Sequence, residues 1–549
     1  MQRPSVPVPL REVLRNGAIV RVEAAWVSAV AAEWAYLVSL LVFAYGAGGV
    51  TAAGLVTTVR MLPPAVLAPF IATIADRLPP SRVLAGIQAA RAVAIGFGAV
   101  VILAGLPPAW IFAVAGLEGL LAVLKRPTTM ALLPALARSP EQLVASNAVT
   151  STGEAAGVLL GPAIGALLLA IGGVGLGFAV PAAAFAMASV IVASIRTPMV
   201  PMGPTAATTT GADAALRSLL GGFGALRRYP SAGLLVSLFA TQTFVRGLLT
   251  VLLVAAAIEL LGLGQAGVGY LNSAIGAGGL IGAVGVMAVV GRRRMGGAVS
   301  AALAAWGLPI AIVGIAPATW LAFPLLGVVG VANAVLDVSG FTLLQRCVPN
   351  ALRARVFGAF EGIVALTFAL GSLVAAPLVG LVGLRAALVV AGALLPALAI
   401  ASAAAVRGAD AAAVVPHRQV DLLRGIPLFA PLSMVVIEQL ARSLEPTRHE
   451  AGTSVIVQGE AGDAYYIVSS GRADVVHDGA RIAEVVAGDG FGEIALLDDR
   501  PRTASIVVRE ALEGYRLPRE AFLEAVTGSP LSARAGARLV ADRLAGMGH

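Results

Sequence analysis

The sequence has 549 residues, of which 58% are hydrophobic and only 12% are charged. Soluble globular chains carry about 25% charged residues, so this composition excludes a protein that faces water throughout. The net charge of +8 divides unevenly, because residues 1–415 hold 24 basic and 12 acidic side chains while residues 416–549 hold 14 and 18. The basic excess therefore belongs to the apolar part, where it indicates membrane topology rather than nucleic-acid binding. Cys347 is the single cysteine, which excludes an intrachain disulfide and a cysteine metal cluster, and we expect no metal.

The first 16 residues are polar and lack the apolar core of a cleaved signal, so we expect a cytoplasmic N-terminal segment. From residue 17 onward the chain is a series of apolar runs, each near the ~20 residues that a helix needs to cross a bilayer. They predict twelve membrane-spanning helices in two halves of six, 17–195 and 231–406, around a central cytoplasmic loop, 196–230. The predicted spans are 17–46, 50–74, 83–105, 108–124, 147–170, 174–195, 231–257, 266–290, 297–315, 319–341, 356–381 and 384–406.

The charges in the connections give an independent indication of topology. With the N-terminus inside, the connections on the inner side carry many arginines, such as Arg292 to Arg294, whereas four of the outer connections carry no basic residue. Arg385 is the one exception. This asymmetry is the positive-inside pattern, so we expect a multi-pass protein of the cell membrane with both termini in the cytoplasm.

Two motifs accompany this arrangement. Ala75-Asp76-Arg77-Leu78, followed by Arg82, lies between the second and third spans, and Gly157-x-x-x-Gly161-Pro162-x-x-Gly165 lies in the fifth. Together with the six-plus-six pattern they resemble the major facilitator superfamily, and most of all its drug and siderophore exporters. The first motif matches only the second half of the family signature, since Pro79-Pro80 replaces its second glycine. The resemblance implies a two-lobed transporter in which Asp76, Arg77 and Arg82 form a cytoplasmic gate; a solvated turn is the alternative.

Charged residues inside membrane spans are costly and therefore indicate function. Glu33 lies near the middle of the first span, Arg60 in the second and Arg246 in the seventh. In the family these spans lie at or near the central cavity, so we predict that Glu33 couples transport to protons or binds a cation. Arg60 and Arg246 are predicted to orient an anionic or amphiphilic substrate. A structural Glu–Arg pair is the alternative, and ion pairs at the inner gate are predicted for Arg91, Glu118, Glu154, Asp337 and Glu361.

After a short linker, 407–416, the pattern changes. Apolar positions at helical spacing end near residue 444, and from Ser454 an alternation of period two with glycine turns predicts strands of a β-roll or jelly roll. Two closing helices are predicted at 518–527 and 530–544, and the second contains Arg538 and Arg543. The predicted fold class is thus a polytopic helical membrane protein followed by a cytoplasmic α+β domain, 417–549.

Residues 491–505 carry the chemistry of this domain. Gly492 opens a short helix, and backbone N–H groups at a helix start attract an anion. Arg502 follows ten residues later, where a returning strand brings its planar guanidinium toward the same phosphate. A carboxylate repels a phosphate, so the presence of Glu493 is explained if it holds a hydroxyl group instead.

This stretch resembles the phosphate-binding cassette of the cyclic nucleotide-binding domain, F-G-E-[aliphatic]-A-L followed by P-R-[small]-A. The resemblance implies that Gly492, Ala495 and Arg502 hold a cyclic phosphate. It gives the ribose 2′-hydroxyl to Glu493 and places Thr503 beside the phosphate or base; a chance turn or a cassette without ligand is the alternative. It also implies that the last helix folds over the base as a lid, where Arg538 or Arg543 contacts it. The predicted nucleotide-binding residues are Phe491, Gly492, Glu493, Ile494, Ala495, Arg502, Thr503 and Ala504.

The sequence therefore predicts a proton-coupled exporter of a small amphiphilic or anionic molecule, regulated by cAMP, with cGMP possible. It does not predict an enzyme, and without a phosphate-binding loop it does not predict an ATP-driven pump. The expected partners are the substrate, the nucleotide and the lipid bilayer, but no nucleic acid. The alternative is a cyclic nucleotide receptor or scaffold whose membrane part transports constitutively or not at all.

Overall fold

The computed structural model divides into two compact units, Met1–Ala413 and Val414–His549. It describes residues 16–75, 79–136, 140–195, 221–286, 295–348, 350–412, 417–432, 434–527 and 530–547.

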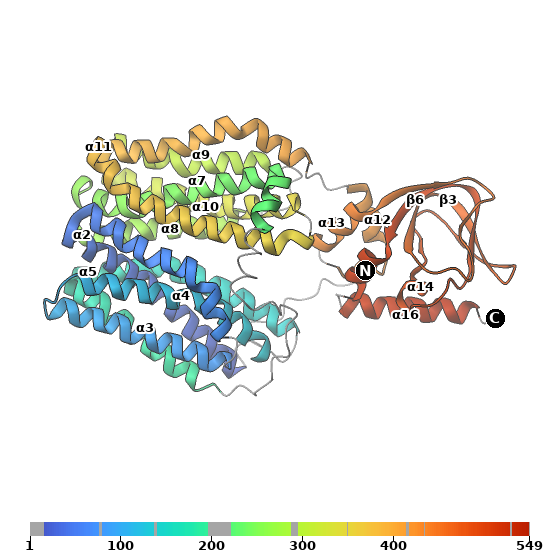
Figure 1. Cartoon of the computed structure of the whole chain (residues 1–549), viewed down its shortest axis with the longest axis horizontal. Coiled ribbons are helices and arrows are strands. Elements are labelled where there is room, and N and C mark those ends of the chain that lie inside the picture. Colours follow the sequence, from blue (N-terminus) through green and yellow to red (C-terminus); the bar gives the residue numbers. More distant parts are fainter. Residues whose placement is uncertain are drawn as a thin grey trace. The chain divides into compact units, whose positions relative to one another are not determined.

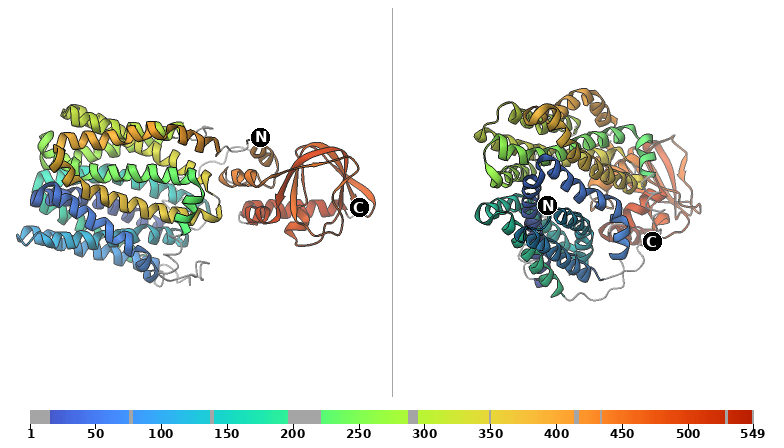
Figure 2. Two further views of the ribbon diagram at one scale, coloured as in Figure 1. Left: turned by 45° about the horizontal axis from the view of Figure 1, so that its top comes forward. Right: turned by 60° about the vertical axis from the view of Figure 1, so that its left-hand side comes forward.

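The first unit consists of long apolar helices that run alongside one another (Figures 1 and 2). Eight stretches of helix among the described residues are long and apolar enough to cross a membrane. The elements are α2 (Gly17–Ala75), α3 (Pro80–Leu103), α4 (Ala109–Leu136), α5 (Pro140–Ala193), α7 (Pro230–Ala255), the π-helix η1 (Ala256–Leu260), α8 (Gly264–Val286), α9 (Gly296–Ile315), α10 (Thr319–Cys347) and α11 (Asn350–Ala412).

Three of these elements each contain two of the predicted spans. Helix α2 has non-helical backbone angles at Gly48 and Gly49, α5 at Gly172 and Gly173, and α11 at Gly383. The φ of +62° at Gly49 is one that glycine adopts without steric cost, so the chain breaks its helical path there within two residues. The breaks fall where the sequence predicts the connections after residues 46, 170 and 381.

The helices form two groups, α2 to α5 and α7 to α11, coloured blue to cyan and green to orange in Figure 1. The groups approach closely through small residues. A Cβ on Gly269 of α8 would lie 2.3 Å from the Pro162 carbonyl oxygen of α5, and one on Gly54 of α2 would lie 2.5 Å from the Ser372 carbonyl oxygen of α11. Small residues at such crossings let membrane helices pack backbone to backbone.

Helix α11 continues to Ala412, beyond residue 407, where the sequence places the start of a linker. Of the predicted central loop, residues 221–228 are helical, and 196–220 lie outside the described residues.

The second unit combines helices with an antiparallel sheet of strand order β1-β6-β3-β4, in which β2 pairs with β6 and β5 with β3. In the longest pairing Tyr466 of β3 lies opposite Arg516 of β6. The elements are α12 (His417–Gly425), α13 (Met434–Ser443), β1 (Glu445–His449), β2 (Ser454–Ile456), β3 (Ala464–His477), β4 (Ala480–Val485), β5 (Gly490–Phe491), α14 (Glu493–Leu497), β6 (Ser505–Pro518), α15 (Arg519–Thr527) and α16 (Pro530–Met547).

Two apolar cores hold this unit together. Phe429, Tyr465 and Phe522 pack ring against ring where the helices meet the sheet, with centroids 4.9–6.1 Å apart. Val468 and Ile506 belong to a second core inside the rolled sheet. Alternate residues of the strands point inward, which is why the period-two pattern predicts a β-roll with closing helices.

Candidate functional site

A tight turn places the start of α14 against the sheet. Gly492 joins β5 to α14 and has a φ of +96°, in the left-handed region that L side chains rarely adopt. A Cβ at this position would also lie 2.7 Å from Nη1 of Arg502. Both the backbone angle and the nearby guanidinium therefore require glycine here.

Arg502 is held beneath this turn. Its side chain is almost fully buried, and Nη1 donates to the Gly492 carbonyl oxygen at 2.9 Å. Nη2 donates to the Ala464 carbonyl oxygen at 2.8 Å and to Asp463 Oδ1 at 3.1 Å. The guanidinium is thus fixed in orientation before any ligand arrives.

Asp463 joins Arg502 to a second arginine. Its other oxygen accepts a hydrogen bond of 3.0 Å from Arg516, which also donates to Glu445 at 2.8 Å. Partial burial opposes the charged form of Asp463. Hydrogen bonds from Arg516 and from its own backbone, with the charges of Arg516 and Arg502, nevertheless hold the pKa of this carboxyl below its ordinary value.

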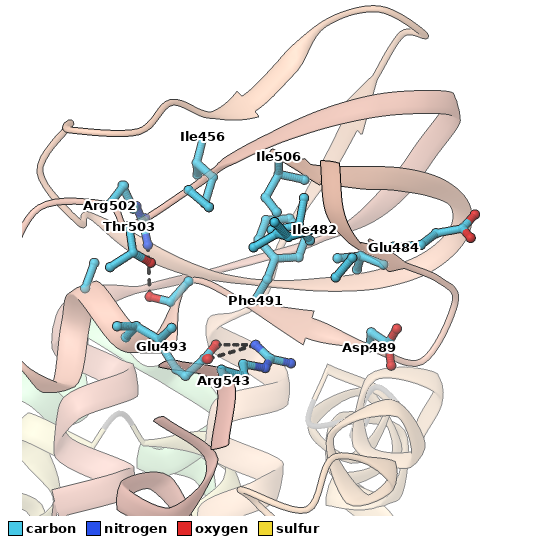
Figure 3. Close-up of a pocket in the computed structure, with 17 residues that line it drawn as sticks. Ile456, Ile482, Glu484, Asp489, Phe491, Glu493, Arg502, Thr503, Ile506 and Arg543 are labelled. Atoms are coloured by element: carbon cyan, nitrogen blue, oxygen red, sulfur yellow. Dashed lines mark hydrogen bonds and ion pairs between the residues drawn. The ribbon is translucent and has the colours of Figure 1, made fainter. Parts of the chain in front are cut away.

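Glu493 is fully buried and is paired with the last helix. Nη1 of Arg543, on α16, donates to both carboxylate oxygens at 2.8 Å, and Nη2 donates to the Gly490 carbonyl oxygen at 3.0 Å. Figure 3 shows this pair at the base of the cavity. Of the two lid arginines that the sequence offers, Arg543 is the one that contacts the site.

These groups surround a cavity of about 350 Å³. One side carries the polar groups Glu493, Arg502, Thr503 and Arg543, and the other is an apolar wall with a carboxylate at its edge, Glu484 (Figure 3). The arrangement suits a ligand with an anionic group, a hydroxyl and a flat apolar body. The apolar wall includes Ile456, Val475, Ile482, Val485 and Ile506.

All eight residues predicted for this site line the cavity. The sequence pattern reveals neither Asp463 as a partner of Arg502 nor Arg516. The signal for Arg516 is weak, because one arginine on a strand among many carries no motif.

In the first unit, charged side chains from three helices meet. Glu33 of α2 lies 3.4 Å from Arg60 Nη2, 3.0 Å from Arg91 Nη2 and 2.7 Å from Lys125 Nζ. Glu118 of α4 accepts from Arg60 Nε at 2.8 Å and from Arg91 Nη2 at 2.5 Å. Glu33 and Arg60 are thus close together, as the structural-pair alternative requires, and Arg91 and Glu118 belong to the same cluster.

Arg246 lies on α7 and is exposed. Its charge acts on Asp337 of α10, whose Oδ2 accepts a hydrogen bond of 2.8 Å from Asn333. Of the predicted gate, Arg82 is exposed in the first turn of α3, and Asp76 and Arg77 lie outside the described residues.

Comparison with known proteins gives two family matches. Residues 25–361 match the model of the Major Facilitator Superfamily, and residues 446–528 match that of the cyclic nucleotide-binding domain.

Among curated proteins, the second unit is similar to cAMP-dependent protein kinase regulatory subunits. The one from Aspergillus niger is 37% identical over 102 residues, which are 18% of this chain and 25% of the relative. The one from Yarrowia lipolytica is 39% identical over 102 residues, 18% and 27% of the two chains. The chain thus spans about a quarter of the length of these relatives.

Among solved structures, the nucleoside transporter NupG superposes with a TM-score of 0.59 at 15% identity, covering 71% of this chain and 98% of that one. At this identity the likeness shows the fold alone. It confirms the transporter fold that the sequence predicts for the apolar part.

Proposed function

The chain belongs to the Major Facilitator Superfamily, and from this membership we propose that it is a proton-coupled exporter whose activity is set by cAMP bound to its second unit. The substrate class is a small amphiphilic or anionic molecule. We propose that it lies in the cell membrane with both termini in the cytoplasm. We do not propose an enzymatic activity. The observation that carries the regulatory part is the cavity in which Arg502, Glu493 and an apolar wall face one another.

The cavity offers one group for each part of cAMP. The cyclic phosphate would lie at the start of α14 beside Arg502, where a guanidinium and backbone amides stabilise an anion. The ribose 2′-hydroxyl would donate to Glu493, and the base would lie against the wall that includes Ile482 and Val485. The identity of 37% to a cAMP-dependent regulatory subunit supports cAMP as the ligand, with cGMP as the competing one.

Regulation would pass through α16. Glu493 holds Arg543 of that helix, so a hydroxyl that arrives at the same carboxylate changes how firmly α16 is held. A nucleotide that binds one transport state about 100-fold better shifts the equilibrium between states by about 2.7 kcal/mol, which is in the usual range of allosteric coupling.

Glu33 is proposed as the coupling carboxylate of transport. Three cations compete with a proton for its two oxygens, so protonation requires that one of them moves away. Replacement of Glu33 by Gln should then abolish proton-dependent transport, and unchanged pH-dependent transport would rule out the proton role of Glu33.

The test of the whole proposal is proton flux in liposomes that contain the purified full chain and a pH-sensitive dye. Amphiphilic cations and organic anions are added one at a time, with and without cAMP. We expect a substrate-dependent proton flux that cAMP changes in the protein as it is, but not in the Arg502→Ala variant. If cAMP binds but the proton flux is the same with and without it, the alternative is favoured, a receptor or scaffold with constitutive or no transport.

A further inference from the structure

The charged cluster in the first unit does not balance. Among the residues that the structure describes, it contains three cations, Arg60, Arg91 and Lys125, but two carboxylates, Glu33 and Glu118. With both carboxylates ionised the cluster carries one excess positive charge. All four carboxylate oxygens already accept from at least one of the cations.

Several donors in the cluster therefore have no acceptor. Arg91 is fully buried, and its Nε and Nη1 have no hydrogen-bond partner among the described residues. Its guanidinium lies 4.1 Å from the ring centroid of Phe185, and Lys125 Nζ lies 4.8 Å from that of Trp26. Aromatic faces attract a cation, but less strongly than an anion does in a medium of low dielectric constant.

An uncompensated charge inside a membrane protein is expensive, and such charges mark binding sites. The cluster is most exposed at Glu33 and Lys125. The side chains of Glu33 and Lys125 are 18% and 11% exposed, whereas those of Arg91 and Glu118 are 0% exposed. Lys125 is therefore the cation that an entering molecule meets first.

We propose that this cluster is a binding site for a small organic monoanion, whose carboxylate or sulfonate contacts Lys125 and whose apolar body lies toward Trp26. One negative charge makes the cluster neutral, whereas a neutral molecule leaves the excess and a cation increases it. The inference rests on the proposed transport function and names its substrate class. It assigns the recognition of charge to Lys125 rather than to Arg60, which two carboxylates already hold.

The test is thermal unfolding of the full chain in detergent with increasing benzoate, at constant ionic strength and against benzamide, its neutral analogue. Benzoate should raise the midpoint of unfolding saturably, and benzamide should not. Lys125→Gln removes the excess charge and should unfold no earlier than the unchanged protein without ligand, but its apparent affinity for benzoate should fall at least about tenfold. Lys125→Arg should keep the response.

Arg385→Gln is the matched control, because it removes the same charge from an exposed position outside the cluster and should keep the response. Equal stabilisation of Lys125→Gln, equal stabilisation by benzamide, or none by benzoate would each overturn the inference.

If Lys125→Gln does not fold, tryptophan emission decides. Benzoate should change the emission of the unchanged protein but not that of Trp26→Phe, and an emission that benzoate leaves unchanged rejects the site. Benzoate that binds but does not cross liposomes would keep this site and count against the transport proposal.

Discussion

Arg543 donates two hydrogen bonds of 2.8 Å to Glu493, although fifty residues separate them in the chain. The carboxylate is fully buried, so the last helix supplies the charge that makes its burial tolerable. The position of α16 and the state of the predicted ribose acceptor are therefore linked.

The first prediction concerns the stability of this pair. Arg543→Ala leaves Glu493 buried without a counter-charge, and breaking a fully buried pair lowers the free energy of unfolding by about 3–5 kcal/mol. Because the Arg543 side chain is 38% exposed, we expect a loss of about 2 kcal/mol. Urea unfolding of residues 414–549, a compact unit with its own cores, measures it. The double variant Arg543→Ala with Glu493→Ala should lose less unfolding free energy than the two single variants lose together. Arg538→Ala, also exposed on α16, is the control, and equal losses for both arginines would contradict a specific role of the pair.

The second prediction concerns the phosphate group. Arg502→Lys keeps the positive charge but loses the planar guanidinium that bonds Gly492, Ala464 and Asp463 at once. Affinity for cAMP should fall by about 100-fold, the equivalent of about 2.7 kcal/mol, in calorimetric titration of the full chain.

Arg500→Lys is the matched control, because Arg500 lies two residues away, pairs with Asp498 at 2.9 Å and does not line the cavity. Its affinity for cAMP should be unchanged. A similar loss in both variants would mean that the substitution disturbs the turn and not the phosphate contact.

The third prediction concerns Asp463 and pH. The pKa of this carboxyl is lower in the folded protein than in the unfolded chain, so the unfolded chain takes up a proton first as the pH falls. The stabilisation from Asp463 should be complete above about pH 4 and be lost below it as the folded carboxyl protonates. In urea unfolding of residues 414–549, Asp463→Asn should be less stable at pH 7 and should lose less stability between pH 5 and 3. Parallel pH profiles would show that Arg516 and Arg502 do not depend on this charge.

The sequence alone predicts the parts of this molecule that are encoded locally. The turn, helix and arginine between Phe491 and Ala504 lie within fourteen residues, so one motif identifies eight residues that line one cavity. Helix lengths follow less closely, since α4 continues to Leu136 and α10 to Cys347, beyond the predicted span ends at 124 and 341.

Pairings across helices are not predicted in this way. Arg91 and Glu118 lie on other helices than Glu33 and Arg60, and no pattern within one span predicts that the four meet in one cluster. The rotation of each helix about its axis, which decides such meetings, depends on packing that no single span encodes. Asp463 and Arg516 escape prediction for the same reason, since the register of β3 against β6 brings them together.

The fourth prediction concerns the choice of base. Thr503 lines the cavity, and we expect its hydroxyl to be the group through which a guanine base gains a hydrogen bond. Thr503→Ala should therefore lower the affinity for cGMP about tenfold and the affinity for cAMP by less than about threefold, since one hydrogen bond is worth roughly 0.5–1.5 kcal/mol. Competition of both nucleotides against a fluorescent cAMP analogue on the full chain measures the two affinities. A greater loss for cAMP would place the hydroxyl on the phosphate instead.

The fifth prediction concerns the close approach of the two helix groups at Gly269 and Pro162. A Cβ on Gly269 would lie 2.3 Å from the Pro162 carbonyl oxygen, closer than two such atoms ever stand, so Gly269→Ala must push α8 away from α5. This contact joins the two halves of the transporter, and a carrier that cannot close there should lose most of its proton flux. Binding of cAMP should be unchanged, because the second unit is a separate compact body.

Gly285→Ala is the matched control on the same helix, since a Cβ at Gly285 meets nothing within 4 Å. The liposome assay with its pH-sensitive dye measures both variants. Normal flux in Gly269→Ala would show that transport does not require this contact.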